Sequence, residues 1–326
     1  MSRRRSLALG LALGVAIAAC HRAPPKDAPA DSAAPSAASA SASASATSTL
    51  APDASAAASL DADAPFRSGI PTSAKAIGHT SVVFKLELST GKKAAFKPAS
   101  RRGPLRYKGE IAARRLALVL GLLNVPRAFF RTFEASSLSA AKGADELIAT
   151  EGVVKGALIP WIPDLAFLAL EQAPLSGEWK QWLRKGAPLP DDKRDLAQQI
   201  STLVAFDYVT GNWDRWSGGN VGLEKDTGTL LYIDNDGAFF EVPPQEGLQR
   251  NKKLLVGIDR FSRGFIARMR LLDEAEITRA IGDEAPGVPL LSGKALAGVF
   301  QRRKELLEVV DAKLKTAGEA VTFEFL

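Results

Sequence analysis

The sequence has 326 residues, of which 46% are hydrophobic and 24% are charged, and its formal net charge is +6. A chain of this length and hydrophobic content suffices for one large domain or two lobes. The basic residues are scattered, which argues against a nucleic-acid-binding protein. The mild positive charge suits a polyanionic ligand such as a nucleotide. The single cysteine, Cys20, excludes a disulfide within the chain and a zinc site built on thiolates.

Residues 1–20 have the pattern of an export signal. Arginines at positions 3–5 precede an apolar run over 7–19, which is too short to cross a bilayer comfortably. The run ends in Ala18-Ala19-Cys20, which resembles a bacterial lipobox. We therefore predict a lipoprotein signal peptide over 1–20 and a lipid anchor on Cys20. The alternative is a plain signal peptide that happens to contain a cysteine.

The predicted lipid anchor determines the expected location. Because no aspartate directly follows Cys20, analogy with lipoprotein sorting favours the outer membrane, facing the periplasm or the cell surface. Residues 21–64 are rich in Ala, Ser, Pro and Asp and offer few large apolar side chains to bury, so we predict a disordered linker there. The globular domain would then occupy 65–326.

The domain begins with a predicted β-hairpin over 78–98. Val82, Phe84, Leu86 and Leu88 alternate with polar or smaller residues, which is the spacing of a strand. A turn over 89–92 leads into a return strand that ends near Lys97.

Two longer segments have helical patterns. Over 108–123, an apolar stripe predicts a helix that Asn124 and Pro126 end; the stripe consists of Ala112, Leu116, Val119 and Leu123. Over 191–210, a second helix would begin at a cap provided by Asp191 or Asp192 and stop at Gly211.

Shorter patterns complete the expected order of elements. Strands are predicted over 129–133, 147–154 and 230–233, and residues 250–315 are mainly helical by pattern. The sequence therefore predicts an α+β fold with two lobes, a β-rich N-terminal lobe and a mainly helical C-terminal lobe, with a cleft between them.

The densest polar cluster closes the helix over 191–210. It contains Asp214 and ends at Asn220, and fourteen residues later an apolar strand ends in Asp234. Carboxylates in Gly- and Asn-rich loops after buried elements suit Mg²⁺ and phosphate chemistry, because hard cations prefer oxygen ligands. Phosphoryl transfer also needs a carboxylate that orients the attacking hydroxyl.

These segments resemble a known group of proteins. DYVTGNWDRWSGGN at 207–220, followed by LLYIDNDGAFF at 230–240, is similar to the catalytic and metal loops of the secretory-pathway kinases of the Golgi casein kinase and Four-jointed type. It is more distantly similar to phosphatidylinositol 3- and 4-kinases and HipA-type kinases. The order of further motifs agrees. AAFKP at 94–98 resembles the strand of the nucleotide lysine, residues 109–128 resemble the glutamate-bearing helix and the strand after it, and residues 153–164 resemble the inter-lobe hinge.

The resemblance implies roles for particular residues. Lys97 would hold the α- and β-phosphates of ATP, and Glu110 would pair with it. Asp214 would be the catalytic residue that orients the acceptor hydroxyl or takes its proton. The remaining implied residues are the metal ligands Asp234 and Asn220, for Mg²⁺ or Mn²⁺, and a loop over the phosphates that includes Gly78 and Ser81.

Each motif also has a structural interpretation. Lys97 could be a surface strand residue, Glu110 a capping acid in the first helical turn, and Asp214 a partner of an arginine. We interpret Asp236 as a turn residue rather than a second metal ligand, and Asn212 as a residue that orders its loop. Other residues left with two interpretations are Trp213 and Trp216, which line the cleft or pack, and His79, which we favour as a solvated residue.

The sequence favours an ATP-dependent kinase that acts on an unidentified hydroxyl-bearing acceptor, a protein Ser/Thr or a sugar. The alternatives are an exported nucleotide-binding pseudokinase, since ATP is normally scarce outside the inner membrane, and a structural lipoprotein without turnover. The expected partners are the nucleotide, the acceptor and a membrane bound through the lipid on Cys20.

Overall fold

The computed structural model describes residues 62–78 and 80–325. The predicted signal peptide, the lipidation of Cys20 and most of the predicted linker lie outside these residues. Residues 62–64, which we assigned to the linker, instead belong to a helix over 62–68. The Asp63 carboxylate pairs with Arg127 at 2.5 Å, so the described domain includes residues before the predicted boundary at 65.

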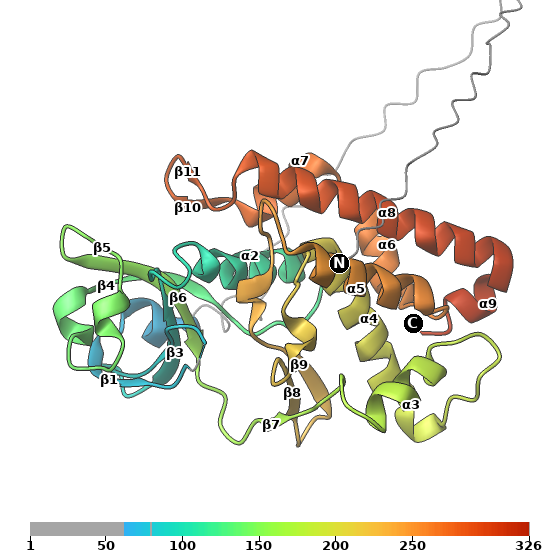
Figure 1. The fold of residues 1–326 in the computed structure, drawn as a ribbon, viewed down its shortest axis with the longest axis horizontal. Helices are drawn as coiled ribbons and strands as arrows, with labels where there is room; N and C mark the ends of the chain where they lie inside the picture. The colour runs from blue at the N-terminus through green and yellow to red at the C-terminus, as the bar shows by residue number, and fades with distance from the viewer. Residues whose placement is uncertain (1–61, 79, 326) are drawn as a thin grey trace, which may run out of the picture. The chain divides into compact units, whose positions relative to one another are not determined.

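The N-terminal lobe is built on an antiparallel sheet (Figure 1). Its strands lie in the order β1-β2-β3-β6-β4, and β5 pairs with β6. Their bounds are β1 (Pro71–Ala76), β2 (Phe84–Leu88), β3 (Lys93–Pro98), β4 (Phe129–Glu134), β5 (Ala149–Thr150) and β6 (Val153–Pro160). Two short 3-10 turns, η1 (Ala135–Leu138) and η2 (Ala144–Glu146), follow β4.

The predicted hairpin is confirmed as β2 and β3. Phe84, Leu86 and Leu88 are buried, whereas Glu87 between them is exposed, as expected for a strand with one face on a core. The predicted strand over 147–154 is wrong in its limits, because a turn at 151–152 separates β5 from β6. The predicted hinge over 153–164 is narrower than expected, since β6 occupies its first eight residues and the chain leaves the lobe only after Pro160.

Helix α2 (Arg106–Val119) follows the hairpin and ends earlier than predicted. Gly121 adopts a left-handed conformation with φ of 67°, and the Leu122 amide donates to the Ala117 carbonyl at 2.8 Å. This closure stops the helix before Asn124. Val119 and Leu123, which we placed on the buried stripe, are exposed. The face that is buried instead comprises Tyr107, Gly109, Glu110, Ile111, Ala112, Ala113, Leu116 and Ala117.

The C-terminal lobe is mainly helical, as predicted (Figure 1). Its helices are α3 (Leu175–Trp182), α4 (Arg194–Thr210), α5 (Gln245–Gly257), α6 (Arg263–Leu271), α7 (Glu274–Ile281), α8 (Gly293–Ala317) and α9 (Glu319–Thr322). A three-stranded sheet comprises β7 (Ala166–Phe167), β8 (Val221–Glu224) and β9 (Thr229–Tyr232), and β10 (Asp283–Ala285) pairs with β11 (Val288–Pro289). Among the described residues, no helix has the length and apolar character that a membrane crossing requires.

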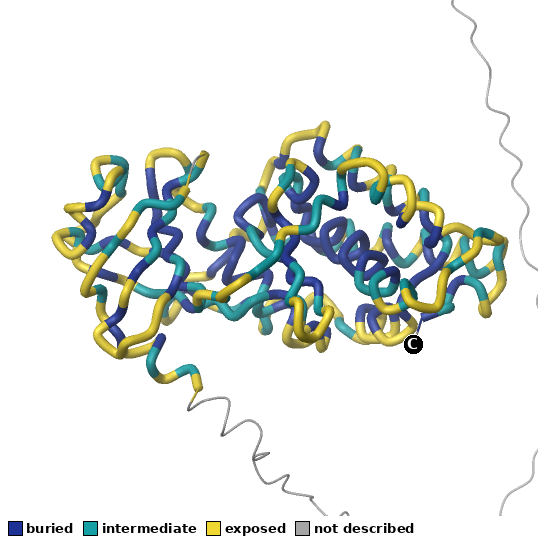
Figure 2. The backbone as a smooth tube through the Cα atoms, turned by 90° about the horizontal axis from the view of Figure 1, so that it is seen from below, coloured by how far each residue is buried: buried dark blue, intermediate teal, exposed yellow. Residues whose placement is uncertain are grey.

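Helix α4 leads directly into the polar cluster. It is buried over most of its length, and Gly211, with φ of 66°, ends it as predicted. The predicted cap is wrong: Asp191 and Asp192 lie in a 3-10 turn, η3 (Asp191–Lys193), and make no side-chain cap bond to α4. Most residues of α4 are buried, and Figure 2 shows buried backbone in the interior of the helical lobe.

Two apolar cores support the two lobes. One core lies on the sheet and includes Phe84 of β2 and Phe96 of β3, which face each other as register partners. The other fills the helical lobe and includes both α4 and the buried face of α2. Helix α2 therefore belongs to the core of the helical lobe while its chain neighbours belong to the sheet, which makes it the structural link between the lobes.

Candidate active site

Lys97 lies at the centre of a group of carboxylates. Strand β3 pairs with β2 and β6, and it places Lys97 opposite Ala157 of β6. The side chain is directed to the helical lobe, where its Nζ contacts the Glu110 carboxylate, lies 2.7 Å from Asp234 and lies 3.9 Å from Asp236. Lys97 is only 9% exposed, which contradicts the interpretation of a surface strand residue.

The charge balance at Lys97 favours the ammonium form. Burial alone would lower the pKa of Lys97, but the negative charges of Asp234, Glu110 and Asp236 outweigh that effect and raise the pKa above its usual range. The site therefore holds one buried cation among three carboxylates.

Glu110 lies on the buried face of α2. It is the fifth residue of the helix, whose first turn contains no acid, so the interpretation as a capping acid is wrong. Its carboxylate accepts hydrogen bonds from Lys97 and, at 2.9 Å, from the backbone N–H of Asn235. Glu110 thus joins the strand that carries Lys97 to the loop that carries Asp234.

Asp234 follows β9 at the start of a 3-10 turn, η5 (Asn235–Gly237). Its backbone is left-handed, with φ of 56° and ψ of 64°, a conformation that is uncommon for a residue other than glycine and is often found at functional sites. Burial opposes ionisation of Asp234, but the contact with Lys97 outweighs it and lowers the pKa of the carboxyl.

Asp236 belongs to the site more closely than predicted. It lies in the turn that we expected, but its carboxylate is buried and contacts Arg106 at 3.0 Å. Burial raises its pKa to about 7; Lys97 and Arg106 oppose this rise, and the nearby Asp234 carboxylate adds to it. The interpretation of Asp236 as only a turn residue is therefore wrong.

Asp214 lies in the loop after α4, before a short 3-10 turn, η4 (Arg215–Ser217). Its backbone N–H donates to Asn212 Oδ1 at 3.2 Å, which confirms that Asn212 orders the loop. The Asp214 carboxylate lies 3.7 Å from Arg106, which thus links it to Asp236. Sequence reasoning did not identify Arg106, because its position at the start of α2 gives no sign of these long-range contacts.

Gly237 permits the close approach of the two loops. A Cβ atom there would lie 2.8 Å from Asp214 Cβ and 2.9 Å from Asn212 Oδ1, both too short for an ordinary contact. The glycine in the sequence Asp-Asn-Asp-Gly is therefore required by the neighbouring loop.

Asn220 supports the same loop. Its Nδ2 donates to the Asp214 carbonyl at 2.8 Å and to Ser217 Oγ at 3.3 Å. Because the amide nitrogen is used in this way, the carboxamide oxygen is the atom that Asn220 could offer to a cation.

Arg215 links the loop that carries Asp214 to the loop that carries Asp234. It is fully buried and contacts Asp207 of α4, the carbonyls of Asn220 and Ile233, and Asn235 Oδ1 at 2.7 Å. Burial raises the pKa of Asp207 to about 6, although its contact with Arg215 opposes that rise. Sequence reasoning missed this residue; the adjacent Asp-Arg pair was the available signal.

The loop between β1 and β2 contains Gly78 and Ser81, while His79 lies outside the described residues. A Cβ atom on Gly78 would lie 2.0 Å from the Ser81 carbonyl, so the loop requires glycine there. Gly78 and Ser81 both line a cavity of about 710 Å³ whose wall contains the cations Arg102 and Lys142 and also the acids Asp145 and Glu146. Ser81 and Lys97 both line a narrow crevice beside it.

Both tryptophans of the polar cluster combine packing with exposure to a cavity. Trp216 stacks on Trp179, with ring centroids 5.6 Å apart, and lines a cavity of about 600 Å³. Trp213 packs edge to face on Phe240 and lines a separate cavity of about 850 Å³ that Arg106 also lines. The two interpretations of these residues are therefore compatible.

The fold matches solved kinase structures. The structure of hydra Fam20 with sugar gives a TM-score of 0.61 at 17% identity, covering 84% of this chain and 93% of that chain. The Golgi casein kinase gives 0.60 at 14% identity, covering 82% of this chain and 78% of that chain, and its structure with Mn/ADP bound gives the same values. This chain has their two-lobed kinase-like fold. No family model and no curated protein matches the sequence.

The candidate site residues come from both lobes of this fold. Lys97 comes from the sheet of the first lobe, Glu110 from the linking helix α2, and Asp214 and Asp234 from two loops of the second lobe. The resemblance found in the sequence therefore extends to the three-dimensional arrangement of the fold.

Proposed function

We propose that this protein is an ATP-dependent phosphotransferase that acts on a hydroxyl group of an acceptor, a protein Ser/Thr or a sugar. The observation that carries the proposal is the position of Lys97 Nζ, which contacts both Glu110 and, at 2.7 Å, Asp234. Active kinases require such a lysine–glutamate pair on the phosphates and an aspartate for the metal ion. Few structural roles would need these residues from three separate elements around one buried ammonium group.

The proposed roles follow from charge and position. Lys97 would bind the α- and β-phosphates, and Glu110 would hold its side chain in place. Asp214 would orient the acceptor hydroxyl and accept its proton. Arg106, which lies within reach of both Asp214 and Asp236, would keep these carboxylates in position. Gly78 and Ser81 would lie over the phosphates.

The available oxygen atoms fit a divalent cation. Asp234, partly exposed, offers a carboxylate and Asn220 a carboxamide oxygen, and both are ligands that Mg²⁺ or Mn²⁺ accept. Among the described residues no group of three or more His, Cys, Asp or Glu forms a metal cage. This agrees with a kinase site, where Mg²⁺ is held by one or two carboxylates together with substrate phosphates. A cation bound there would neutralise charge on the transferred phosphoryl group.

The test is phosphate transfer from radiolabelled ATP by the purified full-length chain with Mg²⁺ or Mn²⁺. The acceptors would be a Ser/Thr-rich protein and an oligosaccharide, offered separately. Asp234→Asn should lower turnover at least about 100-fold, the scale of a lost charge-stabilising group. Asp226→Asn, which removes an exposed acid from the turn between β8 and β9, is the matched control and should retain activity.

Nucleotide binding separates the alternatives. A thermal shift with ATP and Mg²⁺ but no transfer to any acceptor would favour a pseudokinase. No thermal shift and no turnover in the wild-type chain would contradict the proposal and favour a structural lipoprotein.

We further propose that the chain is exported and anchored to the outer membrane by a lipid on Cys20. The proposal rests on the lipobox-like sequence before this single cysteine. Labelling with a radioactive fatty acid should mark the wild-type chain and leave Cys20→Ser unlabelled.

A further inference from the structure

Glu284 of β10 is a buried acid that contacts both lobes. Its carboxylate accepts a hydrogen bond from the Tyr107 hydroxyl at 3.0 Å and lies 2.7 Å from Lys108 Nζ. Lys155 of β6, in the sheet of the first lobe, lies 3.2 Å from it. One carboxylate of the second lobe thus joins the first turn of α2 to the sheet.

These contacts lie next to the proposed catalytic pair. Tyr107 and Glu110 are three residues apart on α2, so their side chains share one face of the helix. Arg115, further along α2, donates to the carbonyls of Ile281 and Asp283 at 2.5 and 2.8 Å. The segment from α7 to β10 therefore supports α2 at two places, and Glu284 is the support nearest to Glu110.

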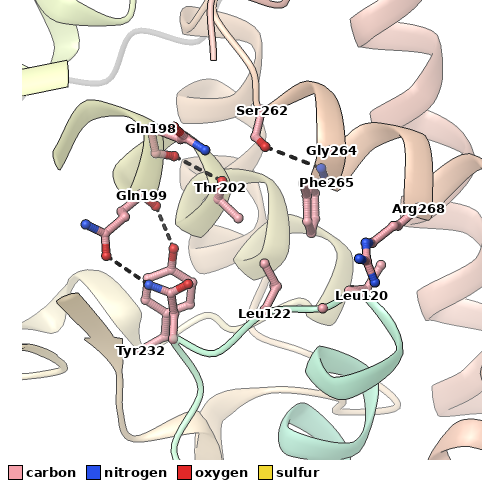
Figure 3. Close-up of a pocket in the computed structure, with 12 residues that line it drawn as sticks. Leu120, Leu122, Gln198, Gln199, Thr202, Tyr232, Ser262, Gly264, Phe265 and Arg268 are labelled. Atoms are coloured by element: carbon pink, nitrogen blue, oxygen red, sulfur yellow. Dashed lines mark hydrogen bonds between the residues drawn. The ribbon is translucent and has the colours of Figure 1, made fainter. Parts of the chain in front are cut away.

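The other end of α2 is also held by the helical lobe. Asn124 Nδ2 donates to Gln199 Oε1 at 3.0 Å, and the Asn124 carbonyl accepts from the Tyr232 N–H at 2.8 Å. Figure 3 shows Gln199 and Tyr232 joined by a hydrogen bond in the small polar pocket of about 260 Å³ beyond the end of α2. Contacts at the start of α2 and just beyond its end thus hold the helix that carries Glu110.

Many kinases position this helix by phosphorylation, but the corresponding segment of this chain has no residue that could be phosphorylated on a hydroxyl group. In many kinases, phosphorylation of a hydroxyl residue in the segment after the metal-binding aspartate orders that segment and the glutamate helix. Here the stretch 235–261 contains no Ser, Thr or Tyr. The contacts of Glu284 with α2 and β6 can hold the helix without such a phosphate group.

Glu284 is suited to that task because it is charged. Burial opposes its ionisation, but the contacts with Lys108, Tyr107 and Lys155 outweigh burial and lower its pKa. The Glu284 side chain is only 3% exposed, so solvent and salt screen its ion pairs less than those on the protein surface.

We propose that Glu284 is a positioning residue, which holds α2 so that Glu110 stays paired with Lys97 without any phosphorylation of the chain. The inference rests on the proposed kinase function. Glu284 itself would touch neither nucleotide nor acceptor.

The test compares Glu284→Gln with Glu274→Gln, which removes the same charge from an exposed position on α7. Glu284→Gln should lower kcat/KM for ATP about tenfold or more, since small misplacements of catalytic groups have large effects. Amide hydrogen exchange should become faster in α2 and stay unchanged in α8. Glu274→Gln should match the wild type in all of these. If Glu284→Gln does not fold, Tyr107→Phe, which removes one contact, should show the same changes to a smaller degree.

A double-mutant cycle distinguishes positioning from a general loss of stability. If Glu284 acts through Glu110, adding Glu284→Gln to Glu110→Gln should cause no further loss of turnover. Additive losses, or an active wild type whose kinetics and α2 exchange are unchanged by Glu284→Gln, would overturn the inference alone. A wild-type chain that neither binds nor turns over ATP would overturn the proposed function, and the inference with it.

Discussion

Arg215 donates through Nε to both carboxylate oxygens of Asp207, at 3.2 and 3.0 Å, in the interior of the helical lobe. The remaining nitrogens of Arg215 reach the loops that carry Asp214 and Asp234. One buried side chain therefore fixes helix α4 and both loops of the proposed active site relative to each other.

Arg215→Gln should destabilise the fold strongly. Breaking a buried ion pair leaves an uncompensated charge and costs about 3–5 kcal/mol, so the free energy of unfolding in urea should fall by this order. Arg279→Gln, which removes an exposed arginine from α7, should leave the denaturation midpoint nearly unchanged. Equal midpoints for the two variants would contradict a structural role for Arg215.

Asp207 should titrate well above the usual range of an aspartate. Its pKa rises from 3.8 to about 6 on folding, so the folded state binds the proton more tightly than the unfolded state does. The contribution of Asp207 to stability is thus full below about pH 4 and is lost as the pH rises through about 6. An NMR titration of the Asp207 carboxyl carbon should have its midpoint near 6; a midpoint near 4 would refute the prediction.

Lys97→Met should abolish nucleotide binding while preserving the apolar part of the side chain. We expect turnover to fall at least about 100-fold, because the ammonium group is the proposed phosphate ligand. Lys92→Met, in the exposed turn of the same hairpin, is the matched control. Isothermal titration with ADP and Mn²⁺ checks binding directly, and undiminished affinity in Lys97→Met would argue against the assigned role.

Arg106→Gln should affect the chemical step more than nucleotide binding. It removes the cation that lies 3.0 Å from Asp236 and 3.7 Å from Asp214, so both carboxylates lose their orientation. We expect kcat to fall about 10–100-fold with a smaller change in KM for ATP. Arg101→Gln, an exposed neighbour, is the control. A rise in KM alone would assign Arg106 to the phosphates instead.

Gly237→Ala should disturb the contact between the two loops. The added methyl group would meet Asp214 Cβ at 2.8 Å, and such overpacking costs about 1–3 kcal/mol. Both stability and kcat should fall. Gly257→Ala, where a Cβ atom would meet nothing within 4 Å, should be neutral in the same thermal and kinetic measurements.

Elements with a strong local pattern were predictable from the sequence. The hairpin of β2 and β3 alternates clearly, and α4 is long, periodic and ended by a glycine. Strand β1 was missed because all of its residues are exposed or half-buried and show no apolar alternation. The stripe assigned to α2 was right for Ala112 and Leu116, which are buried, and wrong for Val119 and Leu123. The helix ends at Val119, so Leu123 lies beyond it and does not continue its buried face.

The candidate site was predictable where local motifs mark it. Lys97, Glu110, Asp214 and Asp234 each stand in a recognisable sequence setting, and the structure brings Lys97 into contact with Glu110 and Asp234. Arg106, Arg215 and Glu284 were not predictable in the same way. Their partners are distant in sequence or are backbone atoms, as with Tyr107 and Glu284, which are 177 residues apart.

The ammonium group of Lys97 serves as an internal counter-ion for the carboxylate of Asp234. A divalent cation that arrives alone must compete with this covalently attached charge, whereas nucleotide phosphates would attract Lys97 away from Asp234. Binding of either ligand therefore weakens the contact between Lys97 and Asp234 that opposes binding of the other. We expect cation and nucleotide to bind with positive cooperativity, each raising the affinity for the other by the same factor, as thermodynamic linkage requires. Such coupling would keep the site free of stray metal ions until a nucleotide arrives.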